Sequence, residues 1–224
     1  MPCTAKKYES LRPEMSIKGL REVDLVITTR EFVRLVTEAG LDFPHLPEEP
    51  FDDPLGVSSG ASQRFGASSG VARAVACELA SSDGVIPVEC TDDGVERFDI
   101  RIPADPACQH PELSIGFAVV SGLARARSFV QHWKEGRYPG VHYVEVMCCP
   151  GGCVGGGGQI QPTDDQRIVL RSSALQAHGE RLALRRARDN PAVQRLYREF
   201  LGEPYGDKSR ELLHTRYTAR SRFW

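Results

Sequence analysis

The sequence lacks any apolar run approaching the ~20 residues that a membrane-spanning helix needs. It also lacks an apolar signal-peptide core, because its first residues, MPCTAKKYESLRPEM, are polar and charged. We therefore expect no membrane span and a cytoplasmic location. The chain also has no large excess of positive or negative charge. The 28 basic and 30 acidic residues are mixed along the 224-residue chain without a basic stripe, which argues against a nucleic-acid-binding role.

A regular framework of paired cysteines is also absent. The chain has seven cysteines, an odd number. Three of them form one dense cluster, and the other four are scattered along the chain: Cys148, Cys149 and Cys153 against Cys3, Cys77, Cys90 and Cys108. This distribution favours reduced thiols and a metal site over a disulfide scaffold. With 41% hydrophobic and 26% charged residues, the composition is that of a globular protein, which excludes wholesale disorder.

A strand–helix–strand pattern gives the clearest indication of fold class. Residues 114–120 and 141–147 are apolar and rich in β-branched side chains, which is typical of strands. The intervening residues 123–136 have helical spacing. Their expected apolar face consists of Leu123, Phe129, Val130 and Trp133. This order predicts a right-handed crossover and a parallel sheet.

Other segments extend this α/β prediction. VDLVITT at 23–29 predicts a buried strand, and Thr28 with Glu31 has capping-box spacing for a helix that ends at Gly40. Residues 84–112 are expected to form a β-hairpin and loop. Residues 56–70 are Gly/Ser-rich and fit either a flexible linker or a tight loop close to a ligand.

The predicted architecture is a parallel-sheet lobe with flanking helices, followed by a helical C-terminal tail. We place the lobe at residues 1–162 and the tail at 163–224, and expect the tail to wrap around something else. Asn190-Pro191 marks a helix start within it, because proline is favoured at the first helical position.

The most informative segment is EVMCCPGGCVGGGGQ, residues 145–159. It follows the C-terminal end of a predicted parallel strand, where α/β sheets usually bind ligands. Six of the eight residues from Gly151 to Gly158 are glycine, which permits close backbone approach to a bulky group. Cys149 and Cys153 are four residues apart, which predicts that both thiols lie on one side of a helical turn.

This cysteine spacing leaves several interpretations open. An iron–sulfur cluster is favoured, because backbone N–H groups of a glycine-rich loop can face an anionic cluster. Zinc, a reactive thiol and a purely structural glycine turn are the alternatives. At the N-terminus, MPCTAKKYE places Cys3 near Lys6, which fits either an activated thiolate or an ordinary cysteine beside solvated lysines.

Taken together, the two segments resemble the second and third signatures of the [FeFe]-hydrogenase (iron-only hydrogenase) catalytic domain. The third has the form E-x-M-x-C-x-x-G-C-x-x-G-G. The similarity extends to VDLVITTREF, to the Gly/Ser loop with its Phe-Gly, and to NPAVQRLYREFLGEP and ELLHTRY. The last two resemble the small-subunit segment of this family, here fused to the same chain.

The resemblance implies an H-cluster, which is a [4Fe–4S] cubane joined through one cysteine to a diiron unit with CO, cyanide and a bridging amine dithiolate. Cys3, Cys149 and Cys153 would ligate the cubane, and Cys153 would also bridge to the diiron unit. Lys6 would donate a hydrogen bond to a cyanide ligand. The remaining implied residues surround the diiron unit: Met1 and Met147 through soft sulfur contacts, and Pro2, Phe65 and Gly66 as lining.

The implied activity is reversible H2 oxidation and proton reduction, with an electron carrier such as ferredoxin. The family's first signature, which supplies the fourth cubane ligand and the proton relay, is not in this sequence. We therefore expect this C-terminal portion to be inactive without a missing N-terminal catalytic half or partner subunit. Cys148 stands where the family usually has a small residue. The alternative is a non-catalytic [4Fe–4S] sensor or cluster-assembly relative without the diiron unit.

Overall fold

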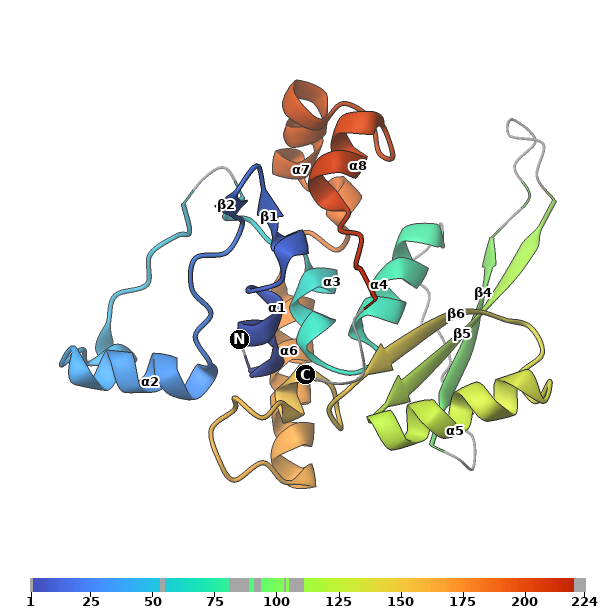
Figure 1. The fold of residues 1–224 in the computed structure, drawn as a ribbon, viewed down its shortest axis with the longest axis horizontal. Helices are drawn as coiled ribbons and strands as arrows, with labels where there is room; N and C mark the ends of the chain where they lie inside the picture. The colour runs from blue at the N-terminus through green and yellow to red at the C-terminus, as the bar shows by residue number, and fades with distance from the viewer. Residues whose placement is uncertain are drawn as a thin grey trace.

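A four-stranded sheet forms the centre of the computed structural model, which describes residues 2–52, 55–80, 89–90, 94–102, 104 and 111–219. The strands lie in the order β3 (Glu89–Cys90), β4 (Glu96–Ile102), β5 (Leu113–Ser121) and β6 (Val141–Met147) (Figure 1). β5 and β6 are parallel, and helix α5 (Leu123–Lys134) connects them. The expected α/β class and the strand–helix–strand unit are confirmed.

The first part of this sheet is antiparallel. β3 pairs with β4, and β4 pairs with β5, so only the β5–β6 pair is parallel. The predicted hairpin in 84–112 corresponds to β3 and β4 where the chain is described. The rest of that prediction, at 84–88, 91–93, 103 and 105–110, lies outside the described residues. The sheet is therefore mixed, with its parallel edge next to the cysteine-rich segment.

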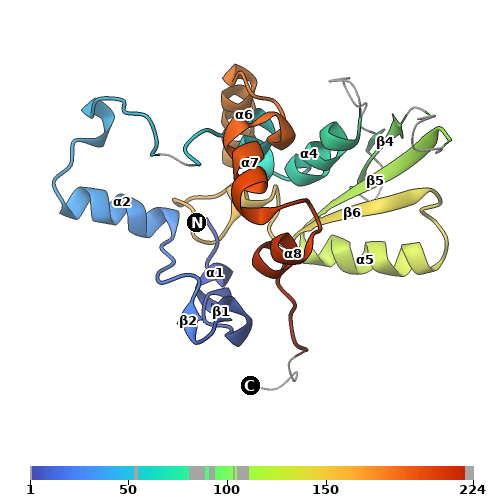
Figure 2. The same ribbon diagram turned by 90° about the horizontal axis from the view of Figure 1, so that it is seen from above.

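Helices cover both faces of the sheet (Figure 2). On one face, α4 (Gly70–Leu79) packs through small alanines against a stacked aromatic pair, Phe98 and Phe117, whose ring centroids are 4.8 Å apart. On the other face, Phe129 of α5 packs beside Tyr138 at 4.6 Å. The two layers contain Phe117 and Phe129, the largest fully buried side chains of the described residues.

The predicted apolar face of α5 is only partly correct. Phe129 is 2% exposed, but Leu123, Val130 and Trp133 are 63%, 45% and 49% exposed. Helical spacing places all four side chains on one broad stripe, yet the sheet covers only one edge of that stripe, where Phe129 lies. A periodic pattern therefore identifies the helix more reliably than it identifies the residues that become buried.

The N-terminal region forms an arm of short elements. It comprises α1 (Ala5–Glu9), a 3-10 helix (Pro13–Met15), β1 (Ser16–Ile17), β2 (Leu20–Arg21), α2 (Thr29–Glu38) and a 3-10 helix (Phe43–His45). The capping box of α2 is confirmed, because the Thr28 side chain accepts from the Glu31 N–H while Glu31 accepts from the Thr28 N–H at 2.7 Å. That backbone bond and Lys7 hold the pKa of Glu31 down to about 2.

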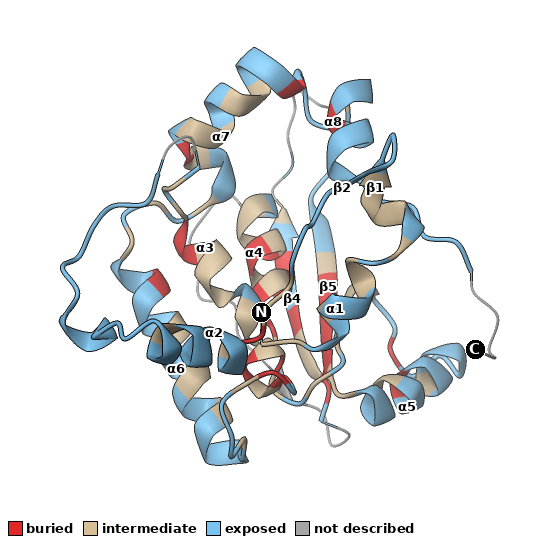
Figure 3. Cartoon of the chain, turned by 60° about the vertical axis from the view of Figure 1, so that its left-hand side comes forward, coloured by how far each residue is buried: buried red, intermediate tan, exposed pale blue. Residues whose placement is uncertain are grey.

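The predicted strand at 23–29 is wrong. Residues 23–27 have no regular secondary structure, and Thr28 caps α2. Val23 and Leu25 are 38% and 77% exposed. β-branched residues favour an extended backbone, but a strand also needs a hydrogen-bonded neighbour, and the described residues place no strand beside this segment. The arm instead carries an exposed apolar surface: α2 is exposed along nearly its whole length (Figure 3), and it lies away from the sheet (Figure 1).

The Gly/Ser-rich segment is tightly packed and does not behave as a linker. It forms α3 (Gly60–Gln63) and a 3-10 helix (Arg64–Gly66) before α4 begins. α3 lies against the long helix α6 (Asp165–Arg181), where a Cβ added at Gly60 would come within 2.5 Å of the Gly179 carbonyl oxygen. Only glycine permits this close backbone approach. The segment is therefore a tight loop, but the group that its backbone approaches here is helix α6, and an approach to a ligand stays a prediction.

The C-terminal residues form a series of helices. After α6 come a 3-10 helix (Ala187–Asp189), α7 (Pro191–Leu196), a π-helical turn (Tyr197–Leu201) and α8 (Asp207–Leu213). The predicted start at Asn190-Pro191 is confirmed, because the Asn190 side chain accepts from the Ala192 N–H at 2.9 Å. α6 packs against α3 and the glycine-rich segment of the same chain, so this part of the tail is integrated with the lobe. Within the described residues, no helix is both long and apolar enough to cross a membrane.

Candidate iron–sulfur site

The cysteine-rich loop turns sharply as it leaves β6. The Gly152 N–H donates to the Cys149 carbonyl at 3.0 Å, and a 3-10 helix follows at Cys153–Gly155. Gly151 and Gly152 have φ values of +74° and +88°, which glycine adopts without strain. The predicted helical turn across Cys149 and Cys153 is therefore wrong, because two left-handed residues interrupt it.

The N-terminal residues pack directly on this loop. The Pro2 carbonyl oxygen accepts from the Gly158 N–H at 3.0 Å. A Cβ added at Gly156 would lie 2.1 Å from that same oxygen, so a side chain there would displace Pro2. Through this contact the fold brings Cys3, which follows Pro2, to a loop that is about 150 residues later in sequence.

The thiols of both segments interact electrostatically. Burial raises the pKa of the Cys153 thiol, and the charges of Cys3 and Cys149 raise it further. The Lys6 ammonium acts in the opposite direction on the same thiol. Cys3, Cys149 and Cys153 are all partly buried and free, whereas Cys148 is exposed.

The opposite side of the loop lies against the segment before α4. The Ser68 N–H donates to the Gly151 carbonyl at 2.9 Å, and Gly152 would meet the Ser68 backbone at 2.6 Å if it carried a Cβ. Phe65 and Gly66 directly precede this contact. Phe65 is 47% exposed, and a Cβ at Gly66 would lie 3.0 Å from Leu175 of α6.

Met147 and Met1 were both predicted to contact the diiron unit, and the structure describes only Met147. Met147 is the last residue of β6 and is partly buried, two positions before Cys149, and its carbonyl accepts from the Gly122 N–H at 2.8 Å. Met1 lies outside the described residues.

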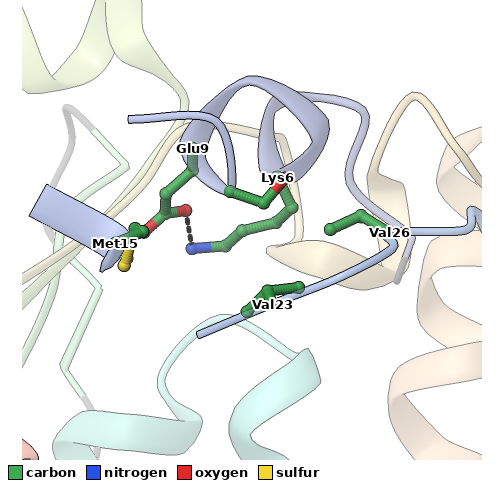
Figure 4. Close-up of a pocket in the computed structure, with 6 residues that line it drawn as sticks. Lys6, Glu9, Met15, Val23 and Val26 are labelled. Carbon is green, nitrogen blue, oxygen red and sulfur yellow. Dashed lines mark hydrogen bonds and ion pairs between the residues drawn. The ribbon is translucent and has the colours of Figure 1, made fainter. Parts of the chain in front are cut away.

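Lys6 lies on α1 at the edge of a cavity of about 250 Å³. The cavity is lined by Lys6, Glu9, Ser10, Met15, Val23 and Val26 (Figure 4). The ammonium of Lys6 forms an ion pair with Glu9, and this bond is the main reason why the pKa of Lys6 is raised. Lys6 is therefore a stable cation that lies within electrostatic reach of Cys3 and Cys153.

Sequence patterns predicted no role for Glu145, which connects β6 to the start of α4. Its carboxylate is in β6, 6% exposed, and accepts from the backbone N–H groups of Ser69 and Ala72 at 2.7 Å each. It thereby satisfies the first turn of α4 and ties that helix to β6. An acidic residue inside a β-branched strand was the available signal for this role.

Ser121, at the end of β5, is a second residue that the sequence did not reveal. Its hydroxyl accepts from the Gly151 N–H at 2.8 Å and donates to the Cys149 carbonyl at 3.3 Å. One side chain therefore supports both ends of the turn that carries Cys149.

The donor set fits an iron–sulfur cluster better than a single metal ion. In the described part of the chain, no three His, Cys, Asp or Glu side chains are arranged to hold one ion. A cubane attaches each thiolate to a different iron, and so accepts thiols that are more widely spaced. Three partly buried thiols, a cation and a glycine loop without bulky side chains are the groups that an anionic cluster requires.

Two family models match most of the chain. The model of the iron only hydrogenase large subunit, C-terminal domain, matches residues 1–157, and that of the iron hydrogenase small subunit matches residues 165–220. A solved structure of [FeFe]-hydrogenase HydA1 from Chlamydomonas reinhardtii is 33% identical, with a TM-score of 0.77, over 98% of this chain and 62% of that chain.

The curated relatives are of two kinds. The NADP-reducing hydrogenase subunit HndD of Solidesulfovibrio fructosivorans is 42% identical over 99% of this chain and 38% of its own length. The cytosolic iron-sulfur assembly component 3 of Mus musculus is 34% identical over 98% of this chain and 46% of its own length. The chain thus spans less than half of either relative. By these matches, the chain belongs to the [FeFe]-hydrogenase family and corresponds to the C-terminal domain of its large subunit followed by the small-subunit segment.

Proposed function

We propose that this chain is the C-terminal portion of an [FeFe]-hydrogenase that contributes three of the cubane ligands of an H-cluster and takes part in reversible H2 oxidation. The observation that carries the proposal is the contact between Pro2 and Gly158, which places Cys3 beside the loop of Cys149 and Cys153. The mutual electrostatic effect of these thiols supports the same grouping.

Each residue has a distinct role in this proposal. Cys3, Cys149 and Cys153 would hold the cubane as thiolates, and Cys153 would also bind the diiron unit. When bound, the cluster supplies the redox chemistry that interconverts H2 with protons and electrons. Lys6 offers a positive charge and N–H donors to an anionic ligand of the cluster. In this proposal Pro2, Phe65, Gly66 and Met147 line the site.

The proposal includes a partner for the exposed apolar surface of the N-terminal arm. Large apolar side chains of this arm are solvent-exposed: Leu11, Leu20, Leu25, Phe32, Leu35, Phe43 and Phe51. Such an extended apolar surface is typical of an interface. We assign it to the rest of the catalytic domain, which would also bring the fourth ligand and the proton relay. Ferredoxin as electron carrier, and the cytoplasm as location, remain proposals.

We also propose the division of the chain into a cluster-binding lobe (1–162) and a small-subunit-like tail (163–224). The ranges of the two family matches support a boundary in this region.

A second function has specific support. The iron-sulfur assembly relatives are comparably similar over the whole chain, so a cubane without a diiron unit is the alternative. Lys6 favours the hydrogenase, because a bare cubane has no cyanide ligand for its ammonium to meet.

Infrared spectroscopy separates the two functions. The matured chain, co-purified with the remaining part of a hydrogenase catalytic domain, is expected to show CO and cyanide bands and to evolve H2 from a reduced dye. The 224-residue chain alone is expected to evolve none. A cubane signal in electron paramagnetic resonance without CO and cyanide bands would reject the hydrogenase and favour the assembly function. H2 evolution by the isolated chain would contradict the need for a partner.

A further inference from the structure

The segment that follows α8 runs past α1 and the β1–β2 hairpin (Figure 2). There the backbone of Thr218 is held through both its N–H and its carbonyl oxygen. Its N–H donates to Glu14 Oε1 at 2.9 Å, and its carbonyl accepts from Arg12 Nη2 at 3.3 Å. Arg12 and Glu14 pair with each other at 3.0 Å, and their side chains are only 17% and 12% exposed. A largely buried ion pair thus fixes the backbone of one residue, Thr218, in the C-terminal tail.

We call this arrangement of Arg12, Glu14 and the Thr218 backbone the clasp. It places the neighbouring Tyr217 against α1. The guanidinium of Arg12 lies 4.7 Å from the centroid of the Tyr217 ring. The Tyr217 hydroxyl donates to Glu9 Oε1 at 3.1 Å, while the other oxygen of the same carboxylate pairs with Lys6. Because both carboxylate oxygens have partners, the orientation of Glu9 is fixed. Lys6 and Tyr217 together lower the pKa of Glu9, so the carboxylate stays charged.

We propose that Tyr217 is a positioning residue for Lys6: its hydroxyl orients Glu9, and Glu9 holds the Lys6 ammonium at the edge of the cysteine site. The tail thereby sets the position of a cation more than 200 residues away in sequence. What Lys6 faces in the loaded protein rests on the proposed function, whereas the Tyr217–Glu9–Lys6 arrangement rests on the contacts of these three side chains alone.

The test measures the acylation rate of Lys6 in the metal-free 224-residue chain by competitive labelling with acetic anhydride and mass spectrometry. Lys7 is an internal control, because both lysine side chains are 44% exposed and Lys7 pairs with a different carboxylate, Glu31, at 2.9 Å. Tyr217→Phe removes the hydroxyl but keeps the ring under Arg12. We expect it to raise the Lys6 rate about two- to twelve-fold, the range for one lost hydrogen bond, and to leave the Lys7 rate unchanged.

Two further variants make the inference specific. Glu14→Ala opens the clasp without touching Tyr217, and is expected to raise the Lys6 rate by a similar factor. In a Glu9→Gln background, Tyr217→Phe is expected to have no further effect, because the connecting carboxylate is gone. Tyr205→Phe, at a 77% exposed site in the same tail, is the matched control.

Either of two results would overturn the inference. One is an unchanged Lys6 rate in both Tyr217→Phe and Glu14→Ala while Glu9→Gln raises it. The other is a parallel rise of Lys6 and Lys7, which would indicate general loosening of the fold. If Tyr217→Phe fails to fold by circular dichroism, Glu14→Ala still decides the outcome. Failure of the chain to bind a cluster would overturn the proposed function and leave this inference standing.

Discussion

Replacing Cys153 by serine is expected to lower iron–sulfur loading of the chain by about tenfold or more, since even residues that only support a metal ligand often have effects of this size. Cys149→Ser should have the same effect. A serine hydroxyl does not ionise as a thiol does, and thiolates are the groups that hold such clusters. The measurement is iron and acid-labile sulfide per chain after anaerobic reconstitution, together with visible absorbance.

Cys148 and Cys77 provide matched controls for this experiment. Cys148 is next to Cys149 but is exposed, and Cys77 lies in α4. Serine at either position is expected to leave cluster loading near the wild-type level. Loss of loading in Cys148→Ser, with retention in Cys153→Ser, would show that the ligands have been wrongly assigned within the loop.

Replacing Glu145 by alanine is expected to destabilise the fold by about 3 kcal/mol, because it leaves the buried N–H groups of Ser69 and Ala72 without an acceptor. Glu145→Gln should be intermediate, since its amide has one oxygen acceptor but turns a donor toward the second N–H. Urea unfolding followed by circular dichroism measures the free energy of unfolding.

Glu38→Ala is the comparison for Glu145. Glu38 is a 60% exposed helical residue paired with Arg34, and such surface pairs contribute about 0–1 kcal/mol. If the two alanine variants unfold at the same urea concentration, Glu145 does not anchor α4. If Glu145→Ala is destabilised as expected, its cluster loading should also fall, because the 67–72 segment supports Gly151 and Gly152.

The parts of the fold that sequence patterns predicted correctly are those set by local chemistry. The β5–α5–β6 unit follows from two apolar runs and a helical period, and the cap of α2 from Thr28 and Glu31. The segment 23–29 failed because a strand depends on a neighbour that local sequence does not specify. The expectation that Leu123 and Trp133 are buried failed for a similar reason, because the position of the helix on the sheet decides which part of a helical stripe is covered.

In the candidate site, too, local sequence predicted individual residues but not the contacts between distant segments. Signature residues predicted the three thiols and Lys6 as site residues, but they did not predict the contacts that join the two segments. The Pro2–Gly158 bond and the Glu145–Ser69 bond connect residues that are far apart in sequence. Tyr217 also lies far from Glu9 in sequence, so no local pattern could have linked it to Lys6. Such pairings become visible only when the chain is folded.

The central claim is that three thiols, Cys3, Cys149 and Cys153, share one iron–sulfur cluster. Iron and sulfide analysis of the reconstituted chain, combined with Mössbauer spectroscopy of 57Fe-enriched samples, tests it most directly. We predict about four irons and about four sulfides per chain, with one iron site spectroscopically distinct because it lacks a cysteine of this chain. A single metal ion per chain without sulfide, or a cluster that forms equally well in Cys3→Ser, would contradict the claim.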